Sequence, residues 1–392
     1  MDLFKFCGKI ALGKDSDKFH PVDRREFSSG WTNTTVRFNC LSDMNRVLCT
    51  TQGGKWKDDS KNVIKTFSKS TTDANGNVTR GEMIDIPWNK RFDADQIDKV
   101  AGFRKFVCDT GDVKMRYRLQ DIVGNKTEID EELVAVGINS IDDAKIALEK
   151  SLAKKKVFLS EYDFAEYIAK VAASEKFKDK LFYISGFYDV AYNAEKDRFY
   201  TNYHVNRVVL APDDAEPNTE LKIDFYFGEN AWNDNQYEET GKVYISGWIN
   251  YYDNMVKKNG FMPLIVAVKE NGKKIAALKR KFEVDDSDAI KQIGLTLKVI
   301  DGAERVEITM DMLDEETRSD IELGLLDFEE LKRELGGIAI GNRISELKFT
   351  ELTPKKNSVQ DTNYTVDDMH AAKAVQVEET EDIDIFSDDD EL

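Results

Sequence analysis

The chain has 392 residues, a net charge of −18, and 41% hydrophobic and 10% aromatic residues, a composition that supports packed cores in two or three domains. It contains no uninterrupted apolar stretch of the roughly 18 residues that a membrane helix needs. Charges run through its first residues, which is unlike a secretory signal. A transmembrane protein, a collagen-like rod and a mostly disordered chain are therefore not expected.

The charge is unevenly distributed along the chain. Residues 1–126 carry a net charge of +6, 127–240 carry −11, 241–284 carry +6 and 285–373 carry −10. The last stretch, 374–392, has nine acidic residues and no basic one. Two basic regions in an acidic chain indicate surfaces for anionic partners.

Residue types that carry catalysis or bind metals show no useful spacing. The four cysteines and three histidines are scattered, which predicts buried, reduced thiols in a cytoplasmic protein, no zinc site and no cofactor. Walker, GxGxxG, GxSxG and HExxH motifs do not occur, so we do not expect an enzyme. A metal-dependent nuclease stays open only because some of the 74 carboxylates will pair in space.

The first third of the chain is predicted to form strands joined by turns. Residues 42–45 have the composition of a turn, and Asn75-Gly76 between 61–69 and 78–86 is a strong hairpin signal. Strand pairs that follow one another without helices favour a compact antiparallel barrel or sandwich.

Helical periodicity begins after Ser140 and again after Ser160, which predicts helices over 141–152 and 161–172. Strands then resume, and their number suits a small closed barrel; the six candidates are 181–188, 198–210, 221–227, 242–252, 261–269 and 273–284. Residues 183–187 and 244–248 share the pattern Tyr-Ile-Ser-Gly-aromatic, which fits either a duplicated domain or chance.

These shifts in pattern and charge divide the chain into five parts. The parts are a basic β-rich domain over 1–126, a helical connector over 127–179, a β-barrel domain over 180–284, an acidic α/β extension over 285–354 and a disordered acidic tail over 355–392.

The strongest functional signal is the alternation of basic and aromatic residues on predicted strands. If 114–119 is a strand, its three cations share one face and form a ladder that an anion would stabilise. Cations that neutralise phosphates and rings that stack on bases are what a single-stranded nucleic-acid site needs. The candidates in the first basic region are Lys55, Trp56, Lys57, Lys65, Phe67, Lys69, Trp88, Lys90, Arg91, Lys114, Arg116 and Arg118. Core rings beside a solvated charged face would give the same pattern.

The second basic region shows similar residues. On the predicted strand 242–252, one face carries aromatic residues separated by Ser and Asn, which is more typical of a stacking platform than of a core. The candidates here are Tyr244, Trp248, Tyr252, Lys257 and Lys258.

The acidic tail contains a hydrophobic anchor. Ile383, Ile385 and Phe386 lie within an acidic run that ends with Asp388, Asp389, Asp390, Glu391 and Leu392. Such a segment is able to dock on a basic patch with an apolar pocket, or to compete with nucleic acid for the chain's own basic surface. A plain solubilising tail is the simpler alternative.

Taken together, the strand-rich segments, the basic and aromatic strands and the acidic tail resemble bacterial and phage single-stranded DNA-binding proteins. The resemblance is one of organisation over 30–284 and 374–392. It implies an α+β, mainly β fold with one or two antiparallel barrels of the oligonucleotide/oligosaccharide-binding (OB) type, a helical connector and a disordered tail. The family's aromatic anchor usually lies at or next to the last residue, whereas six residues follow Phe386 here. Residues 285–352 have no counterpart in the family.

The resemblance implies a non-enzymatic protein that coats single-stranded DNA during phage replication or recombination and recruits other proteins through its tail. The alternative is a phage structural or scaffold protein that forms homo-oligomers and binds no nucleic acid. A DNA-mimicking inhibitor fits the total charge but not the basic first region.

Overall fold

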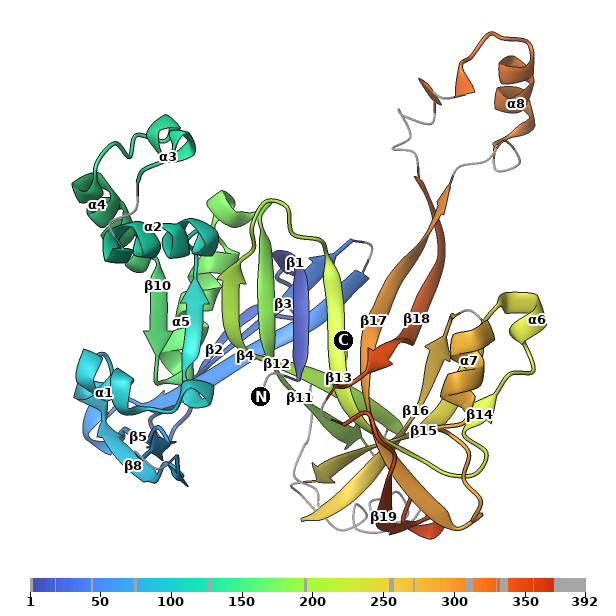
Figure 1. Cartoon of the computed structure of the whole chain (residues 1–392), viewed down its shortest axis with the longest axis horizontal. Coiled ribbons are helices and arrows are strands. Elements are labelled where there is room, and N and C mark those ends of the chain that lie inside the picture. The colour runs from blue at the N-terminus through green and yellow to red at the C-terminus, as the bar shows by residue number, and fades with distance from the viewer. Residues whose placement is uncertain are drawn as a thin grey trace.

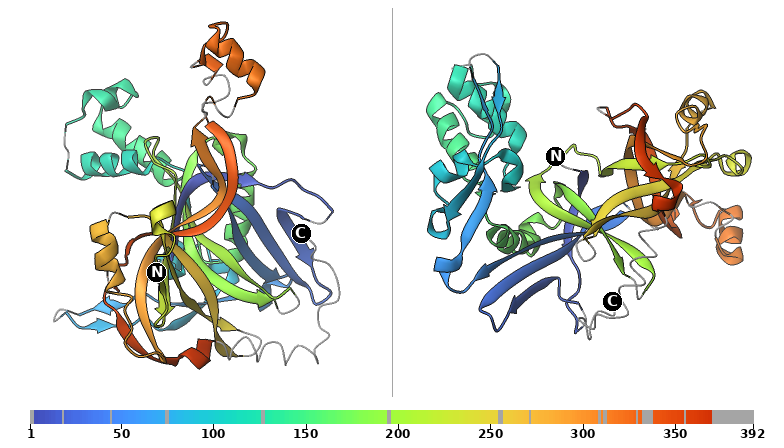
Figure 2. Two further views of the ribbon diagram at one scale, coloured as in Figure 1. Left: turned by 90° about the vertical axis from the view of Figure 1, so that its right-hand side faces the viewer. Right: turned by 90° about the horizontal axis from the view of Figure 1, so that it is seen from below.

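The computed structural model describes residues 3–17, 19–43, 45–73, 76–125, 128–193, 196–253, 257–270, 272–307, 310, 313–328, 330–331, 338–354 and 356–369. Its main body is a sheet that runs through the whole molecule, with a helical lobe at one end and a long two-stranded arm near the other (Figure 1; Figure 2). Within these residues, no helix combines the length and hydrophobicity that crossing a membrane would need.

Fifteen strands form the main sheet. They are β1 (Phe4–Leu12), β2 (Val22–Glu26), β3 (Trp31–Ser42), β4 (Asn45–Trp56), β9 (Phe106–Asp109), β10 (Lys155–Phe158), β11 (Leu181–Asn193), β12 (Arg198–Leu210), β13 (Asn218–Phe227), β14 (Trp232–Asn233), β15 (Val243–Asp253), β16 (Lys258–Val268), β17 (Ala289–Glu307), β18 (Ile338–Leu352) and β19 (Gln360–Thr365). Two small ribbons pair β5 (Val63–Phe67) with β8 (Met83–Pro87) and β6 (Thr71–Thr72) with β7 (Val78–Thr79).

The helices gather mostly in one lobe and at the ends of loops. They are α1 (Ala94–Lys99), α2 (Val113–Asn125), α3 (Glu131–Ala135), α4 (Ile141–Leu152), α5 (Glu161–Ala172), α6 (Tyr237–Thr240), α7 (Gly272–Lys279) and α8 (Glu315–Glu322). The expected helices over 141–152 and 161–172 are confirmed, and the hydroxyls of Ser140 and Ser160 cap them by accepting the N–H groups of Asp143 and Asp163.

The prediction of one or two separate OB-like antiparallel barrels joined by a helical connector is wrong. The strands belong to a single mixed sheet, in which β12 pairs in parallel with both β4 and β9 and β16 pairs in parallel with β18. The expected connector, 127–179, contributes strand β10 to that sheet. Alternating hydrophobicity identifies a strand but does not tell which other strand it pairs with.

Within this sheet, two sets of strands each pair in a closed ring, in which the last strand pairs with the first. Each ring is here called a circuit. The first circuit runs β1, β3, β4, β12, β11 and back to β1, and the second runs β13, β15, β16, β18, β17 and back to β13. The circuits are joined directly, because β1 also pairs with β13. The strands between 180 and 284 are thus divided between the two circuits.

The two circuits share one continuous hydrophobic core. Buried phenylalanines from both circuits contribute to it, including Phe6, Phe38 and Phe225, and Phe164 of α5 and Phe282 after α7 pack into the same core. All four cysteines are free and buried, as expected, and burial raises the pKa of Cys40 and of Cys108 to about 12.

Two segments that were expected to be strands are helical. Residues 114–119 lie within α2, and most of 273–284 belongs to α7. In α2 the apolar residues Met115, Leu119 and Ile122 recur at helical spacing and pack together. This helical pattern extends over more residues than the strand-like alternation of basic and apolar residues over 114–119. Paired strands, β6 with β7 and β5 with β8, flank the turn predicted at Asn75-Gly76, and Asn75 itself lies outside the described residues.

The C-terminal third forms the arm. Strands β17 and β18 pair over most of their length and extend away from the body, with α8 at the far end (Figure 1). Strand β19 lies within the stretch that was expected to be disordered from residue 355, and it pairs with β17. Residues 370–392 lie outside the described residues.

Gly53 in β4 lies against the start of α5. A β-carbon at this position would be 2.2 Å from the backbone nitrogen of Tyr162 and 2.3 Å from the carbonyl carbon of Glu161. We expect Gly53→Ala to lower the free energy of unfolding by about 1–3 kcal/mol, because the helix must move off the strand. Urea unfolding measures this. Gly102→Ala, where nothing lies within 4 Å, is the matched control, and equal stability of both variants would contradict the prediction.

Candidate nucleic-acid interface

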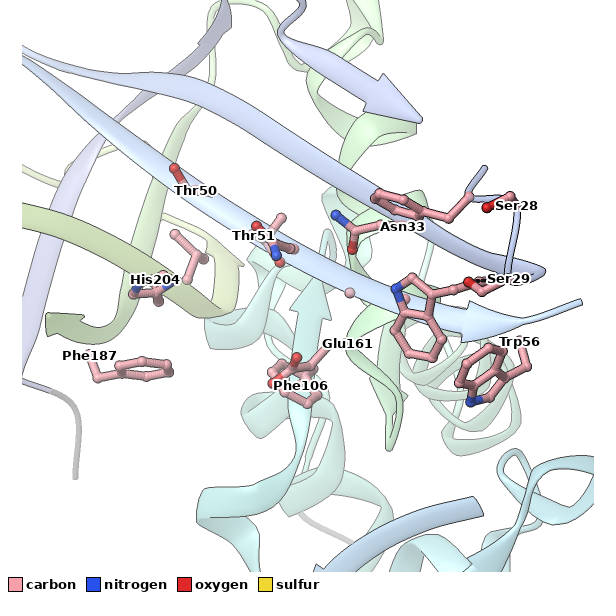
Figure 3. A pocket seen from close by; sticks show the side chains of 16 residues that line it. Ser28, Ser29, Asn33, Thr50, Thr51, Trp56, Phe106, Glu161, Phe187 and His204 are labelled. Carbon is pink, nitrogen blue, oxygen red and sulfur yellow. Dashed lines mark hydrogen bonds between the residues drawn. The ribbon is translucent and has the colours of Figure 1, made fainter. Parts of the chain in front are cut away.

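A cleft of about 980 Å³ opens on the first circuit, between β3 and β4 on one side and β11 and β12 on the other (Figure 3). A second cleft of about 700 Å³ adjoins it on the side of β5. The two clefts, here called the aromatic groove, have six lining residues in common: Trp31, Gly54, Trp56, Phe106, Glu161 and Phe187. The groove therefore continues from the main sheet to the β5–β8 ribbon.

Two tryptophans stand together in the groove. Trp31 and Trp56 are directly opposite each other on β3 and β4, and their ring centroids lie 5.1 Å apart in an edge-to-face arrangement. Gly54 allows this packing, since a β-carbon there would be 2.2 Å from the Trp31 ring. Both rings are half-buried, so each keeps an accessible part while its orientation is fixed.

A second ring pair lies toward the other end of the groove. Phe187 and His204 are cross-strand partners on β11 and β12, and their rings are stacked with centroids 5.0 Å apart. Phe187 is 45% exposed. The Asp189 carboxylate lies 3.1 Å from Nε2 of His204. The groove thus contains two separate ring pairs, Trp31 with Trp56 and Phe187 with His204.

Four cations line the side of the groove near β5: Lys61, Lys65, Arg104 and Lys105. Within the described part of the chain, none of them has a carboxylate within ion-pair distance. Burial lowers the pKa of Lys105, the positive charge of Lys69 lowers it further, and the charge of Asp98 opposes this shift. Cations that have no acidic partner favour an anionic ligand.

One carboxylate enters the same groove. Glu161 is the first residue of α5, a position where the helix dipole favours an acid (Figure 3). Its side chain is exposed at the helix end, but desolvation by neighbouring protein atoms raises its pKa. Electrostatic attraction to His204 and Arg104 opposes this rise. Above that pKa its charge repels phosphate.

Three of the candidates from the sequence line the groove: Trp56, Lys65 and Trp88. Trp88 is only 7% exposed and lies under the guanidinium of Arg91, 4.0 Å away, so it supports the site rather than offering a free ring. Lys55 stands over the ring of Tyr162 at 5.3 Å.

Other candidates from the first region are held by neighbours. Lys57 pairs with Glu26 at 2.9 Å, and Lys69 pairs with Asp98 at 2.6 Å. Arg91 forms a two-bond contact with Asp163. Phe67 lies under Arg104, and Lys90 is exposed.

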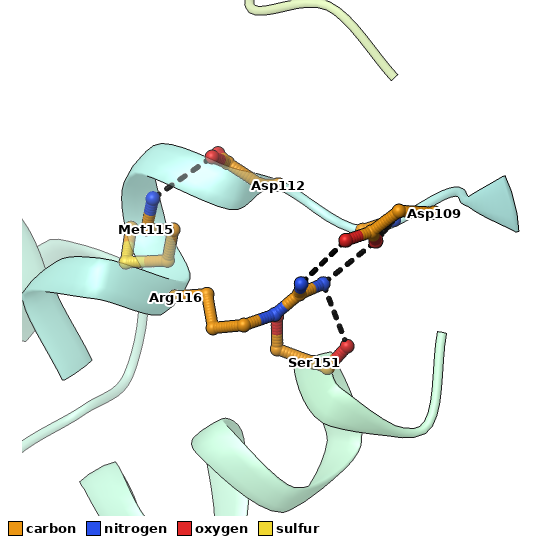
Figure 4. A network of polar contacts seen from close by, with 6 residues as sticks. Asp109, Asp112, Met115, Arg116 and Ser151 are labelled. Carbon is orange, nitrogen blue, oxygen red and sulfur yellow. Dashed lines mark hydrogen bonds and ion pairs between the residues drawn. The ribbon is translucent and has the colours of Figure 1, made fainter. Parts of the chain in front are cut away.

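The expected cation ladder over 114–119 does not exist, because the segment is helix α2. Arg116 is buried and donates to Asp109 at 2.5 and 2.8 Å and to Ser151 (Figure 4). Arg118 pairs with Asp130 and Glu132, and Lys114 is exposed outside the aromatic groove. The fold of the helical lobe therefore sets the positions of Lys114, Arg116 and Arg118.

The second candidate region lies on β15 and the following turn. Tyr244, Trp248 and Tyr252 do share the face away from the main core. Tyr252 is 53% exposed, and Lys257 and Lys258 are exposed beside it. The tail candidates Ile383, Ile385, Phe386, Asp388, Asp389 and Asp390 lie outside the described residues.

The candidates chosen from the sequence did not include Trp31, Phe187, Lys61, Arg104 or Lys105, all of which line the groove. A signal for Trp31 was present, because a hairpin that turns at 42–45 places residue 31 opposite residue 56. Phe187, Arg104 and Lys105 lie on β11 and just before β9, both of which pair with β12, and the pairing of β12 with β4 is visible only in the structure.

Among the described residues, no group of three or more His, Cys, Asp or Glu side chains is gathered as a metal site would require. No protein-family model matches the sequence, and no curated protein does. One solved structure with similarity is a deletion mutant of the single-stranded DNA-binding protein from Thermus aquaticus, with 8% sequence identity, 76% of this chain and 87% of that chain covered, and a TM-score of 0.28. Similarity at this level does not establish a common fold.

Proposed function

We propose that the chain is a non-enzymatic protein that binds single-stranded DNA in the aromatic groove. The observation that carries the proposal is the meeting of two ring pairs with four unpaired cations in one open groove among the described residues. Exposed rings accept unpaired bases, and the cations neutralise the backbone. Paired bases present no free ring face, so single strands are preferred.

The finer proposal keeps the roles expected from the sequence. The protein coats DNA in the cytoplasm during phage replication or recombination, and the acidic segment around Phe386 recruits partner proteins and competes with DNA when free. Deletion of 374–392 is then expected to tighten DNA binding, because it removes nine negative charges.

The test is a titration of labelled single- and double-stranded oligonucleotides at several salt concentrations. We expect single strands to bind more tightly, with log K falling by about 0.7 per neutralised phosphate against log salt, hence a slope of roughly −3 for four groove cations. Lys65→Ala should make the slope shallower by about 0.7. Lys150→Ala, an exposed α4 lysine outside the groove, is the control and should leave the slope unchanged. Equal affinity for both strand types would refute the proposal.

The second candidate function is assembly with other copies, and the arm favours it. Leu323 and Leu325, which follow α8 at its end, are each 71% exposed. Measurement of the size of the protein without DNA separates the two functions. A large homo-oligomer that shows no preference for single strands would support assembly instead.

Glu161→Gln is expected to bind single-stranded DNA more tightly at pH 7, by roughly 1 kcal/mol or about fivefold, because one negative charge leaves the groove. The pKa of Glu161 is raised, so wild-type protein should lose this charge earlier than an ordinary glutamate as the pH falls. The difference in affinity between the two proteins should therefore narrow as the pH falls, and it should do so at a higher pH than an ordinary glutamate would allow. Binding curves at constant salt check this, and a gap that does not depend on pH would contradict it.

A further inference from the structure

The second circuit carries an aromatic face of its own. Tyr226 on β13 is the cross-strand partner of Trp248 on β15, and Phe261 on β16 lies beside them. These rings point away from the main core, into which the neighbouring Phe225 is packed. They form a separate small cluster, here called the second aromatic face.

The chain's own C-terminal segment covers this face. Strand β19 pairs with β17, and the ring of Tyr364 lies edge-on to Tyr226 at 5.9 Å and to Phe261 at 5.0 Å. Met369 follows and is only 3% exposed in the same cluster. Residues 360–369 are here called the cover. The cover is held by the strand pairing of β19 with β17, by the Thr362 hydroxyl, which donates to the Ile290 carbonyl, and by side-chain packing on the outer side of the sheet.

The second aromatic face occupies the position that the aromatic groove occupies in the first circuit. In pairing order, β15 and β16 correspond to β3 and β4, the strands that carry Trp31 and Trp56. On both strand pairs the rings stand on the face opposite the main core. One circuit leaves its rings accessible, and the other has them covered by the chain.

The chemistry of the cover resembles that of a nucleotide strand. It carries one aromatic ring, Tyr364, together with the exposed carboxylates of Asp361 and Asp367, while the Asp368 carboxylate accepts hydrogen bonds from the Thr365 N–H and hydroxyl. Next to the covered rings, the exposed part of the face offers Tyr252, Lys257 and Lys258, which are the residue types found in the groove. These residues belong to the stretch 241–284, which carries a net charge of +6.

We propose that the outer face of β13, β15 and β16 is a second binding surface for unpaired bases, and that the cover occupies it until single-stranded DNA displaces it. The proposal rests on the proposed function of the aromatic groove. A DNA strand long enough to reach from the aromatic groove to the second aromatic face displaces the cover, whereas a short oligonucleotide binds in the aromatic groove alone. Binding of long strands therefore includes the release of residues 360–369.

A reversible disulfide between β17 and β19 tests this, because the oxidised and reduced forms of one variant are compared. Ala289 and Thr365 are directly paired on β17 and β19, so Ala289→Cys with Thr365→Cys places two thiols within reach of a disulfide. We expect the oxidised form to bind long oligonucleotides at least about threefold more weakly than the reduced form, and short ones equally well. Equal binding of long strands by both forms would overturn the proposal.

Release of the cover is the complementary test. Tyr364→Ala with Met369→Ala should tighten binding of long strands and lengthen the DNA that is protected from nuclease, and addition of Trp248→Ala should cancel the gain. Tyr117→Ala on α2 is the exposed-ring control. Tighter self-association without tighter DNA binding would overturn the proposal and mark the face as a protein contact. If neither wild type nor variants bind single strands, the proposed function fails first.

Discussion

Replacement of Trp56 by alanine is expected to weaken single-stranded DNA binding by about 1–3 kcal/mol, the loss of one stacked base. Trp56 contacts Trp31 edge-to-face, so the substitution also frees the second ring from its fixed orientation. The salt dependence should stay the same, because no phosphate contact is removed. Fluorescence anisotropy at three salt concentrations measures the affinity and its slope together.

Tyr117→Ala is the matched control for this experiment. Tyr117 is 70% exposed, but it lies on α2 and does not line the aromatic groove. Its loss should leave affinity unchanged. If Trp56→Ala and Tyr117→Ala bind equally well, the groove is not where bases stack.

Arg116→Ala is expected to lower the free energy of unfolding by about 3–5 kcal/mol, because the buried carboxylate of Asp109 loses its partner. Burial acts to raise the pKa of Asp109, but Arg116 and the Gly111 N–H hold it below its ordinary value. This stabilisation is present above the unfolded-state pKa of about 4 and is lost as the pH falls through the lower folded-state pKa. The stability gap to wild type should therefore shrink in acid.

Denaturant unfolding between pH 7 and 3 checks this, and DNA binding of the folded variant gives the second readout. Arg118→Ala is the matched control, since its pairs with Asp130 and Glu132 are at the surface and a much smaller loss is expected. Unchanged stability of Arg116→Ala with weaker DNA binding would restore the phosphate-binding role expected from the sequence.

The contrast at Arg116 shows why a short pattern misleads. Residues 114–119 alternate basic and apolar side chains, which fits a strand, but they are also the first part of a longer helical stripe that continues to Ile122. Six residues do not distinguish the two periods. The buried partner, Asp109, precedes the helix and meets Arg116 only after the lobe has folded.

Trp56 and Lys65 are two groove residues that local sequence patterns predict as candidates. Both were selected because a ring and a cation follow one another on strands, and both line the groove. Their neighbours Phe187 and His204 come from more than 100 residues further along the chain. The groove exists because β12 lies parallel to β4, and no local pattern indicates that pairing.

The sequence by itself determined most strands, the helices after Ser140 and Ser160, the buried thiols and the uneven charge. These depend on alternation, capping and composition, which act over a few residues. Only the tertiary structure decided which strands pair, which cations are neutralised and which aromatic face is covered by residues 360–369. Each of these depends on contacts between distant segments, whose free energies are set by packing and burial once the chain has folded.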